Sequence, residues 1–103
     1  MDWNCYTAPA MGVPFWPDKM VDCDAGVVWY CEVKAVGTRH DKTRVEGQKA
    51  KLRQLHRRGF PASFCVGNTD IDEMMSRVMA WIINGRVGVP PCLGIYEDCN
   101  ETV

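Results

Sequence analysis

No apolar run in this sequence approaches the ~20 residues that a helix needs to cross a bilayer, so we expect no membrane-spanning segment and no membrane partner. The amino terminus, MDWNCYTAPAMG, also lacks the basic start and the apolar core of a secretory signal peptide. Both absences favour a cytoplasmic protein. The chain of 103 residues has the length of one domain, which is enough to bury a modest core.

The ligand spacings of structural zinc sites are also missing. The chain has no C-x-x-C pair and only two histidines, and Cys92 and Cys99 are separated by six residues. Three other cysteines, Cys23, Cys31 and Cys65, lie in apolar strand-like runs, where a free cysteine behaves as a small buried hydrophobic residue. In a reducing compartment we therefore expect free thiols rather than disulfides.

Acidic residues are scarce in the middle of the chain. Residues 34–58 hold nine lysines and arginines against two acids, whereas the rest of the chain holds three against eleven. The formal net charge of −1 therefore conceals a basic block. A one-sided basic surface is typical of proteins that bind nucleic acid, and the alternative is a solvated helix face without a function.

The spacing of apolar and turn-forming residues predicts an α/β domain. Strands rich in β-branched and aromatic residues are predicted at 18–23, 27–35 and 61–67. Helices are predicted at 44–58 and at about 70–83. A short turn joins the first two strands into an antiparallel hairpin. This order predicts a small mixed β-sheet flanked by helices, with a core at about 12–84 and an irregular tail at 85–103.

The second predicted helix carries the clearer signals. Asp70 and Glu73 have the spacing of a capping box, which predicts the start of the helix. Methionine, isoleucine and valine then recur at helical spacing, and we interpret this stripe as core. In the first helix Gly47 is unfavourable, because glycine weakens a helix interior by ~1 kcal/mol relative to alanine.

The second predicted strand, VVWYCEVKA, carries an acid and a base on one face. Glu32 and Lys34 are two residues apart, and side chains alternate along a strand. An unpaired carboxylate on a buried strand is costly. The sequence leaves three interpretations open: an exposed pair at the strand end, a structural salt bridge, or half of a metal site. In a metal site Glu32 would bind a hard cation such as Mg²⁺, and Lys34 would reach toward a phosphate.

A second carboxylate is expected beside the first. Asp18 opens the first strand, and antiparallel register about the predicted turn matches residue 18 with about residue 32. Asp18 and Glu32 can therefore converge on one cation. Gln48 shares a helix face with Leu52 and Leu55. Because the leucines need a core, we expect Gln48 to point toward the sheet.

This set of residues resembles the PD-(D/E)XK nuclease superfamily, and more narrowly the VRR-NUC family, particularly its small stand-alone members in phages and bacteria. The matching segments are GVPFWPD (12–18), YCEVKA (30–35) and EGQKAKLRQLHRRGF (46–60). The sequence departs from the family pattern in two places. No acidic helix is recognisable before Gly12, and the residues VPFW separate this glycine from the Pro-Asp pair.

The resemblance implies a restriction-endonuclease-like fold over the single domain 1–103 and metal-dependent hydrolysis of DNA. Asp18, Glu32 and the main-chain carbonyl of Val33 would bind Mg²⁺ or Mn²⁺. Lys34 would contact the scissile phosphate or position the attacking water, and Gln48 would hold that water or the substrate.

The resemblance also implies partners. It suggests a homodimer acting on branched DNA such as Holliday junctions, in a bacterial cytoplasm or in that of a phage host. Basic side chains near the site are expected to grip the DNA backbone: Arg39, Lys42, Arg44, Lys49, Lys51 and Arg53. The alternative is a nucleic-acid-binding module of the same fold with weakened catalysis.

Overall fold

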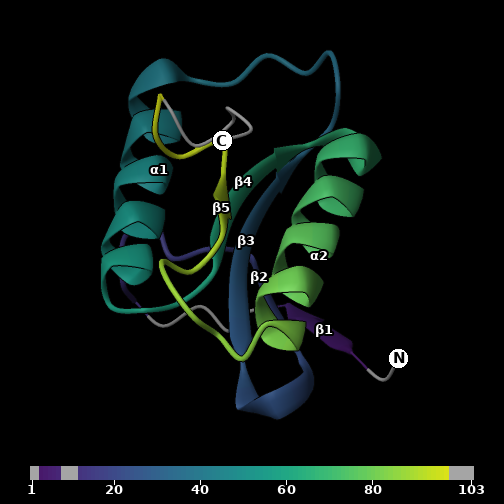
Figure 1. The fold of residues 1–103 in the computed structure, drawn as a ribbon. Coiled ribbons are helices and arrows are strands. Elements are labelled where there is room, and N and C mark those ends of the chain that lie inside the picture. Colours follow the sequence, from purple (N-terminus) through teal and green to yellow (C-terminus); the bar gives the residue numbers. More distant parts are fainter. Residues whose placement is uncertain (1–2, 8–11, 98–103) are drawn as a thin grey trace.

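One mixed sheet of five strands organises the chain (Figure 1), whose computed structural model describes residues 3–7 and 12–97. The strands lie in sequence order: β1 (Asn4–Thr7), β2 (Lys19–Asp22), β3 (Val28–Lys34), β4 (Ala62–Val66) and β5 (Cys92–Leu93). Two helices cover opposite faces of the sheet: α1 (Lys42–Arg57) and α2 (Gly67–Ile83). The predicted fold class, a small mixed sheet flanked by helices, is confirmed.

The register of the central strands decides which side chains meet. β2 pairs with β3 in antiparallel fashion, with Lys19 opposite Cys31. Continued by one residue, this register places Asp18 opposite Glu32, as the hairpin in the sequence predicts. β3 pairs with β4 in parallel, which sets Phe64 beside Glu32. β1 is antiparallel to β2, and β5 is parallel to β4.

Both helices begin earlier than the sequence predicts. α1 begins at Lys42 because the carboxylate of Asp41 accepts hydrogen bonds from the backbone N–H groups of Thr43 and Arg44, at 2.8 and 3.2 Å. α2 begins at Gly67, so the predicted capping box is wrong. Asp70 instead lies in the first turn and accepts a hydrogen bond from the backbone N–H of Val66.

Two short strands, β1 and β5, have no counterpart in the sequence prediction. β5 lies within the tail that we expected to be irregular, and Ile95 just beyond it is 1% exposed. Two arginines hold this segment against the domain: Arg77 donates to the carbonyl of Cys92 at 2.9 Å, and Arg53 donates to the carbonyl of Ile95 at 2.8 Å. The part of the tail from Cys92 to Ile95 is therefore fixed to the domain, and its β5 forms one edge of the sheet.

Side chains along β3 and β4 point alternately to the two faces of the sheet, so the hydrophobic core consists of two clusters, one on each face. Beneath α2 lie buried Trp29, Cys31, Cys65, Met74 and Val78. The burial predicted for the cysteines is thus confirmed, and that of the methionine stripe is confirmed for Met74 and Val78, whereas Ile83 at its end is exposed. A smaller cluster beneath α1 contains Leu52, Ala62, Phe64 and Ile95. Among the described residues, neither helix has the length and apolar character to cross a membrane.

Candidate functional site

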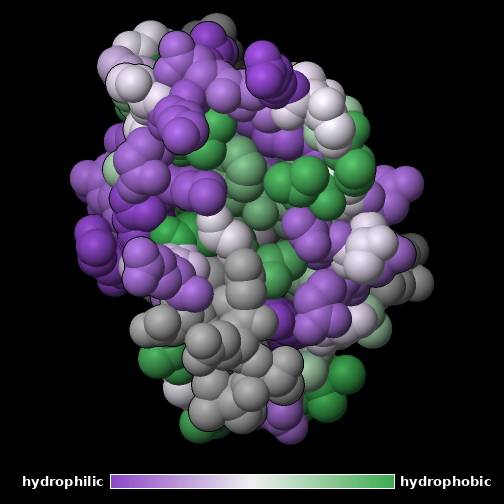
Figure 2. Space-filling view, turned by 90° about the horizontal axis from the view of Figure 1, so that it is seen from above, coloured by the Kyte–Doolittle hydropathy of each residue, from purple (hydrophilic) through white to green (hydrophobic). Residues whose placement is uncertain are grey.

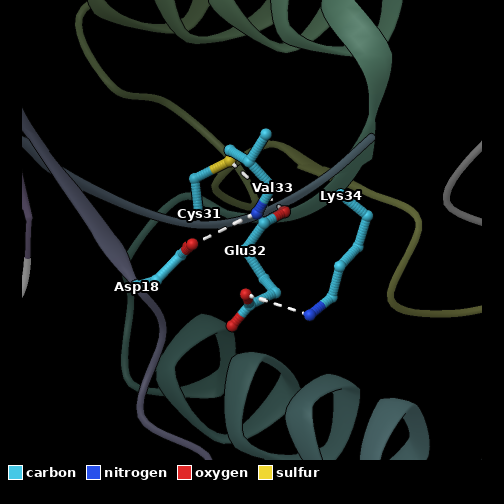
Figure 3. Close-up of polar contacts among 5 residues, drawn as sticks. All are labelled: Asp18, Cys31, Glu32, Val33 and Lys34. Carbon is cyan, nitrogen blue, oxygen red and sulfur yellow. Dashed lines mark hydrogen bonds and ion pairs between the residues drawn. The ribbon is translucent and has the colours of Figure 1, made fainter. Parts of the chain in front are cut away.

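Glu32, which is buried, and Lys34, which is partly buried, form an ion pair on the face of β3 that is covered by α1. Oε2 of Glu32 lies 3.4 Å from Nζ of Lys34, and Glu32 is 4% exposed (Figure 3). Cys31 and Val33, the alternate residues, point to the opposite side. The exposed strand-end interpretation is therefore wrong, because the pair is enclosed by the domain.

Asp18, directly before the neighbouring strand β2, adds a second carboxylate. Its Oδ1 accepts a hydrogen bond from the backbone N–H of Val33, with an N–O distance of 3.4 Å. Figure 3 shows the carboxylate of Asp18 directed at the backbone of β3 between Glu32 and Lys34. The site therefore holds two carboxyl groups and one ammonium group, which leaves an excess of one negative charge when both carboxyl groups are ionised.

The excess negative charge contributes to a raised pKa of the Glu32 carboxyl group. Burial raises the pKa of its carboxyl group, and the nearby charge of Asp18 raises this pKa further. The ammonium group of Lys34 acts in the opposite direction, but the net shift is upward. A positive charge placed between Asp18 and Glu32 would favour the ionised form, so the site is electrostatically suited to a cation.

On the same side of the sheet, the side chain of Gln48 carries an oxygen atom that has no hydrogen-bond partner among the described residues. Gln48 is 5% exposed on α1, the helix that passes beneath Glu32 and Lys34 in Figure 3. Within the described residues its Oε1 is buried and accepts no hydrogen bond. Leaving a buried acceptor unpaired costs about 1–3 kcal/mol. This orphaned oxygen fits a site that binds a water molecule, a phosphate-bound water or a cation.

The donor atoms match a hard divalent cation. Carboxylate and carbonyl oxygens are the ligands that Mg²⁺ and Mn²⁺ prefer. In the described ranges, no cluster of three or more His, Cys, Asp and Glu could hold a metal, so main-chain oxygen or water would have to complete the coordination. The thiol of Cys31 faces away, and a hydrogen bond to Cys65 and burial raise its pKa, so it stays neutral.

The residues before Asp18 support the site, and the sequence prediction did not include them. Pro17 is completely buried, and the ring of Trp16 meets that of Tyr30 edge-on with centroids 5.6 Å apart. These contacts anchor the segment that enters β2. The Trp-Pro pair directly before an acid was the signal that could have identified them.

The six predicted DNA-binding side chains fall into two groups. Arg39, Lys42 and Arg44 are exposed, and they lie in the segment that joins β3 to the first turn of α1. The other three are partly buried and have partners within the domain: Lys49, Lys51 and Arg53. Figure 2, a view from above, shows hydrophilic side chains gathered on the side of α1.

Partners of the second group indicate what these residues do in the fold. Nζ of Lys49 lies 5.1 Å from the centroid of the Phe64 ring, and Lys51 donates to the side chain of Gln54 at 2.8 Å. Arg53 divides its guanidinium group between the carbonyl of Ile95 and a salt bridge to Glu46, both at 2.8 Å. A role of Arg53 in DNA binding stays a prediction, whereas its contacts within the fold are those to Ile95 and Glu46.

No family model and no curated protein matches this sequence. A solved structure described as a VRR_NUC domain is similar, with a TM-score of 0.53 and 22% sequence identity. The similarity covers 77% of this chain and 78% of that one. This chain therefore has the fold of a VRR_NUC domain, and the resemblance stated from the sequence is confirmed at the level of the fold.

Proposed function

We propose that this protein is a nuclease that hydrolyses phosphodiester bonds in DNA with the help of Mg²⁺ or Mn²⁺. The observation that carries the proposal is the group of Asp18, buried Glu32 and Lys34, together with the unpartnered buried oxygen of Gln48 on α1. The likeness to a VRR_NUC domain supports it, because that domain is named for a nuclease and shares this fold.

Asp18, Glu32 and the carbonyl oxygen of Val33 are the proposed metal ligands. Glu32 lies in β3 and Asp18 directly before β2, so the register of the hairpin brings the two carboxylates to the same place without rearrangement of the sheet. A divalent cation at this place would acidify a bound water and offset negative charge at the phosphate. It would also relieve the repulsion from Asp18, which adds to the effect of burial in raising the pKa of Glu32.

Lys34 and Gln48 are the proposed groups that act on the substrate. The ammonium group of Lys34 is held 3.4 Å from Glu32, so it stands beside the place where a phosphate would approach the metal ligands. There it stabilises the charge that develops in the transition state. Gln48 accepts a hydrogen bond from the attacking water through Oε1 and so orients it.

Exposed basic residues are proposed to bind the DNA backbone. Arg39, Lys42 and Arg44 follow Lys34 along the chain, at the end of the sheet where β3 finishes. Contacts from such side chains reach phosphates and read no bases, so we expect binding that depends on DNA shape more than on sequence. For branched DNA such as a Holliday junction, two symmetric cuts require two sites, which a homodimer would provide.

A second candidate is a nucleic-acid-binding module of the same fold with weakened catalysis. It is favoured by the small number of acidic ligands among the described residues. Both functions predict DNA binding, and only the nuclease predicts strand cleavage.

Labelled linear, flapped and four-way DNA would distinguish these functions. Wild-type protein and Glu32→Gln are incubated with each DNA, with Mg²⁺ or Mn²⁺ or with a chelator. We expect metal-dependent cleavage by the wild type and none by Glu32→Gln. Binding without cleavage under all conditions would favour the module, and the absence of both would reject the proposal.

A further inference from the structure

Two features that look unfavourable in the sequence meet in the folded protein. Gly47 lies inside α1, where glycine weakens a helix. Phe15 belongs to the segment VPFW, which departs from the family pattern just before Pro17 and Asp18. A Cβ atom built on Gly47 would lie 2.7, 2.7 and 2.8 Å from three atoms of the Phe15 ring. The ring therefore rests directly on the backbone of α1, in space that only glycine leaves open.

The backbone of Phe15 is strained in this position. Its φ of 63° lies in the left-handed region, which a bulky residue rarely adopts. The residue is also 44% exposed, so full burial of the ring does not compensate for the strain. Strain of this kind persists when surrounding structure imposes it, and it is frequent where a functional site is held in shape.

The contact joins the two segments that carry the proposed site. Phe15 lies three residues before Asp18, and buried Pro17 stiffens the connection between them. Gly47 directly precedes Gln48 on the helix. A change in the spacing between the ring and the helix would therefore alter the distance between the carboxylate of Asp18 and the oxygen of Gln48.

We propose that packing of Phe15 on Gly47 fixes the spacing between the segment before β2 and α1, and thereby positions Asp18 and Gln48. Neither Phe15 nor Gly47 offers a ligand or a charge, so both are positioning residues. The consequence for catalysis rests on the proposed function. The positioning itself is a property of the folded protein and can be measured without metal or DNA.

The backbone N–H of Val33 reports on the position of Asp18, because it donates to Oδ1 of that residue. In isotope-labelled, metal-free protein we expect its NMR resonance to shift in Gly47→Ala, whose methyl group displaces the ring, and also in Phe15→Ala. The double variant should resemble Phe15→Ala, since the methyl group then displaces nothing. A matched control is Ser76→Ala, at an exposed position of α2, which should leave the resonance in place.

An unchanged Val33 resonance in folded Gly47→Ala and Phe15→Ala would overturn the positioning role. If Gly47→Ala does not fold, Phe15→Ala alone decides, because it removes the ring without adding an atom to the helix.

A second measurement connects positioning with metal binding. We expect both single variants to bind Mn²⁺ about tenfold more weakly than the wild type, which is typical when a supporting contact of a metal site is lost. Ser76→Ala should bind it as the wild type does. Wild-type affinity in both Phe15→Ala and Gly47→Ala would overturn the role. If the wild type itself binds no Mn²⁺, the proposed function fails, whereas the Val33 resonance still decides the positioning.

Discussion

The backbone N–H of Val33 donates a hydrogen bond to Oδ1 of Asp18 at 3.4 Å. This bond fixes the carboxylate that directly precedes β2 to the residue of β3 that separates Glu32 from Lys34. This bond explains why the two carboxyl groups stay close despite their repulsion. The backbone holds Asp18 in place, and Lys34 balances one of the two charges. A cation bound between the two carboxyl groups would neutralise the remaining charge.

Divalent metal should stabilise the wild type, and this effect should require Asp18. A ligand that binds only the folded state stabilises it by ~2.7 kcal/mol at 100 times its dissociation constant, which corresponds to about 10 °C in the melting temperature of a domain this small. Asp18→Asn keeps an oxygen for the Val33 hydrogen bond but loses the charge. We expect it to melt at least as high as the wild type without metal and to gain nothing from Mn²⁺.

The matched control is Asp22→Asn, which removes an exposed acid from the other end of β2 and should keep the metal response. Thermal scans with Mn²⁺ and with a chelator measure both variants. An equal rise in Asp18→Asn and in the wild type would remove Asp18 from the site.

The raised pKa of Glu32 predicts a pH-dependent stability in metal-free protein. Below the ordinary value of 4.5, the carboxyl group is protonated in both folded and unfolded chains. As the pH rises from 4.5 through the raised value, the unfolded chain releases this proton first, so the folded state loses stability. Glu32→Gln has no such group, so its stability relative to the wild type should increase over this interval.

Denaturation midpoints between about pH 4 and 8, measured in chelator, test this expectation. Glu73→Gln is the control, because Glu73 is an exposed residue of α2 whose ion pair with Arg77 lies outside the site. A constant difference between Glu32→Gln and the wild type across the range would contradict the electrostatic account of the site.

Contacts of the site between residues close together in the sequence were predicted, whereas contacts between residues far apart in the sequence were not. The hairpin turn fixes the register of Asp18 and Glu32 locally, and helical spacing alone directs Gln48 inward, so both were predicted. The contact of Phe15 with Gly47 spans 32 positions and leaves no periodic pattern, so glycine in the helix looked like a defect. Only the three-dimensional structure supplies its reason.

The tail was missed for a similar reason. β5 is two residues long, too short for any alternation of apolar and polar side chains to indicate a strand. Arg53, which donates a hydrogen bond to Ile95 next to this strand, lies 42 positions earlier in the chain. In the sequence it cannot be distinguished from the other basic residues of the helix. A side chain predicted to grip DNA thus has a partner that local patterns could not reveal.

Arg53→Lys should separate the structural role of this side chain from its charge. Lysine keeps the positive charge but lacks the forked guanidinium group, in which two different nitrogens donate to Ile95 and Glu46. We expect a loss of about 1 kcal/mol in the free energy of unfolding, because the hydrogen bond from Arg53 to the backbone of Ile95 is lost or weakened. Arg44→Lys, at an exposed position, should change stability by less than about 0.5 kcal/mol. Equal stability of the two variants in urea denaturation would show that the Arg53 contacts contribute nothing.

Lys34 should matter for cleavage far more than for DNA affinity. Its ammonium group stands beside the proposed metal ligands, where it opposes charge that develops only in the transition state. We expect Lys34→Ala to lower the cleavage rate by about 100-fold or more, with DNA binding changed by less than about threefold. Lys42→Ala, which removes an exposed charge, should show the reverse pattern. Cleavage by Lys34→Ala at the wild-type rate would reduce Lys34 to the structural partner of Glu32.

The exposed basic residues between β3 and α1 should determine how strongly salt weakens DNA binding. Each phosphate contact releases condensed counterions, so the logarithm of the affinity falls with the logarithm of salt concentration by about 0.9 per contact on duplex DNA. The test variant replaces three residues with alanine: Arg39, Lys42 and Arg44. If all three contact phosphates, the slope should become shallower by about 2.7, and affinity for unrelated sequences should fall equally.

The control removes the same number of charges from exposed positions at or just after the C-terminal ends of the two helices: Arg57, Arg58 and Arg86. A general loss of positive charge would weaken binding in both triple variants alike, whereas phosphate contacts beside the site would flatten the slope only in the first. Fluorescence anisotropy with duplex DNA over a series of salt concentrations gives both slopes. Equal slopes in the test variant and the wild type would mean that the segment after β3 is solvated surface, and that DNA approaches Lys34 from another side.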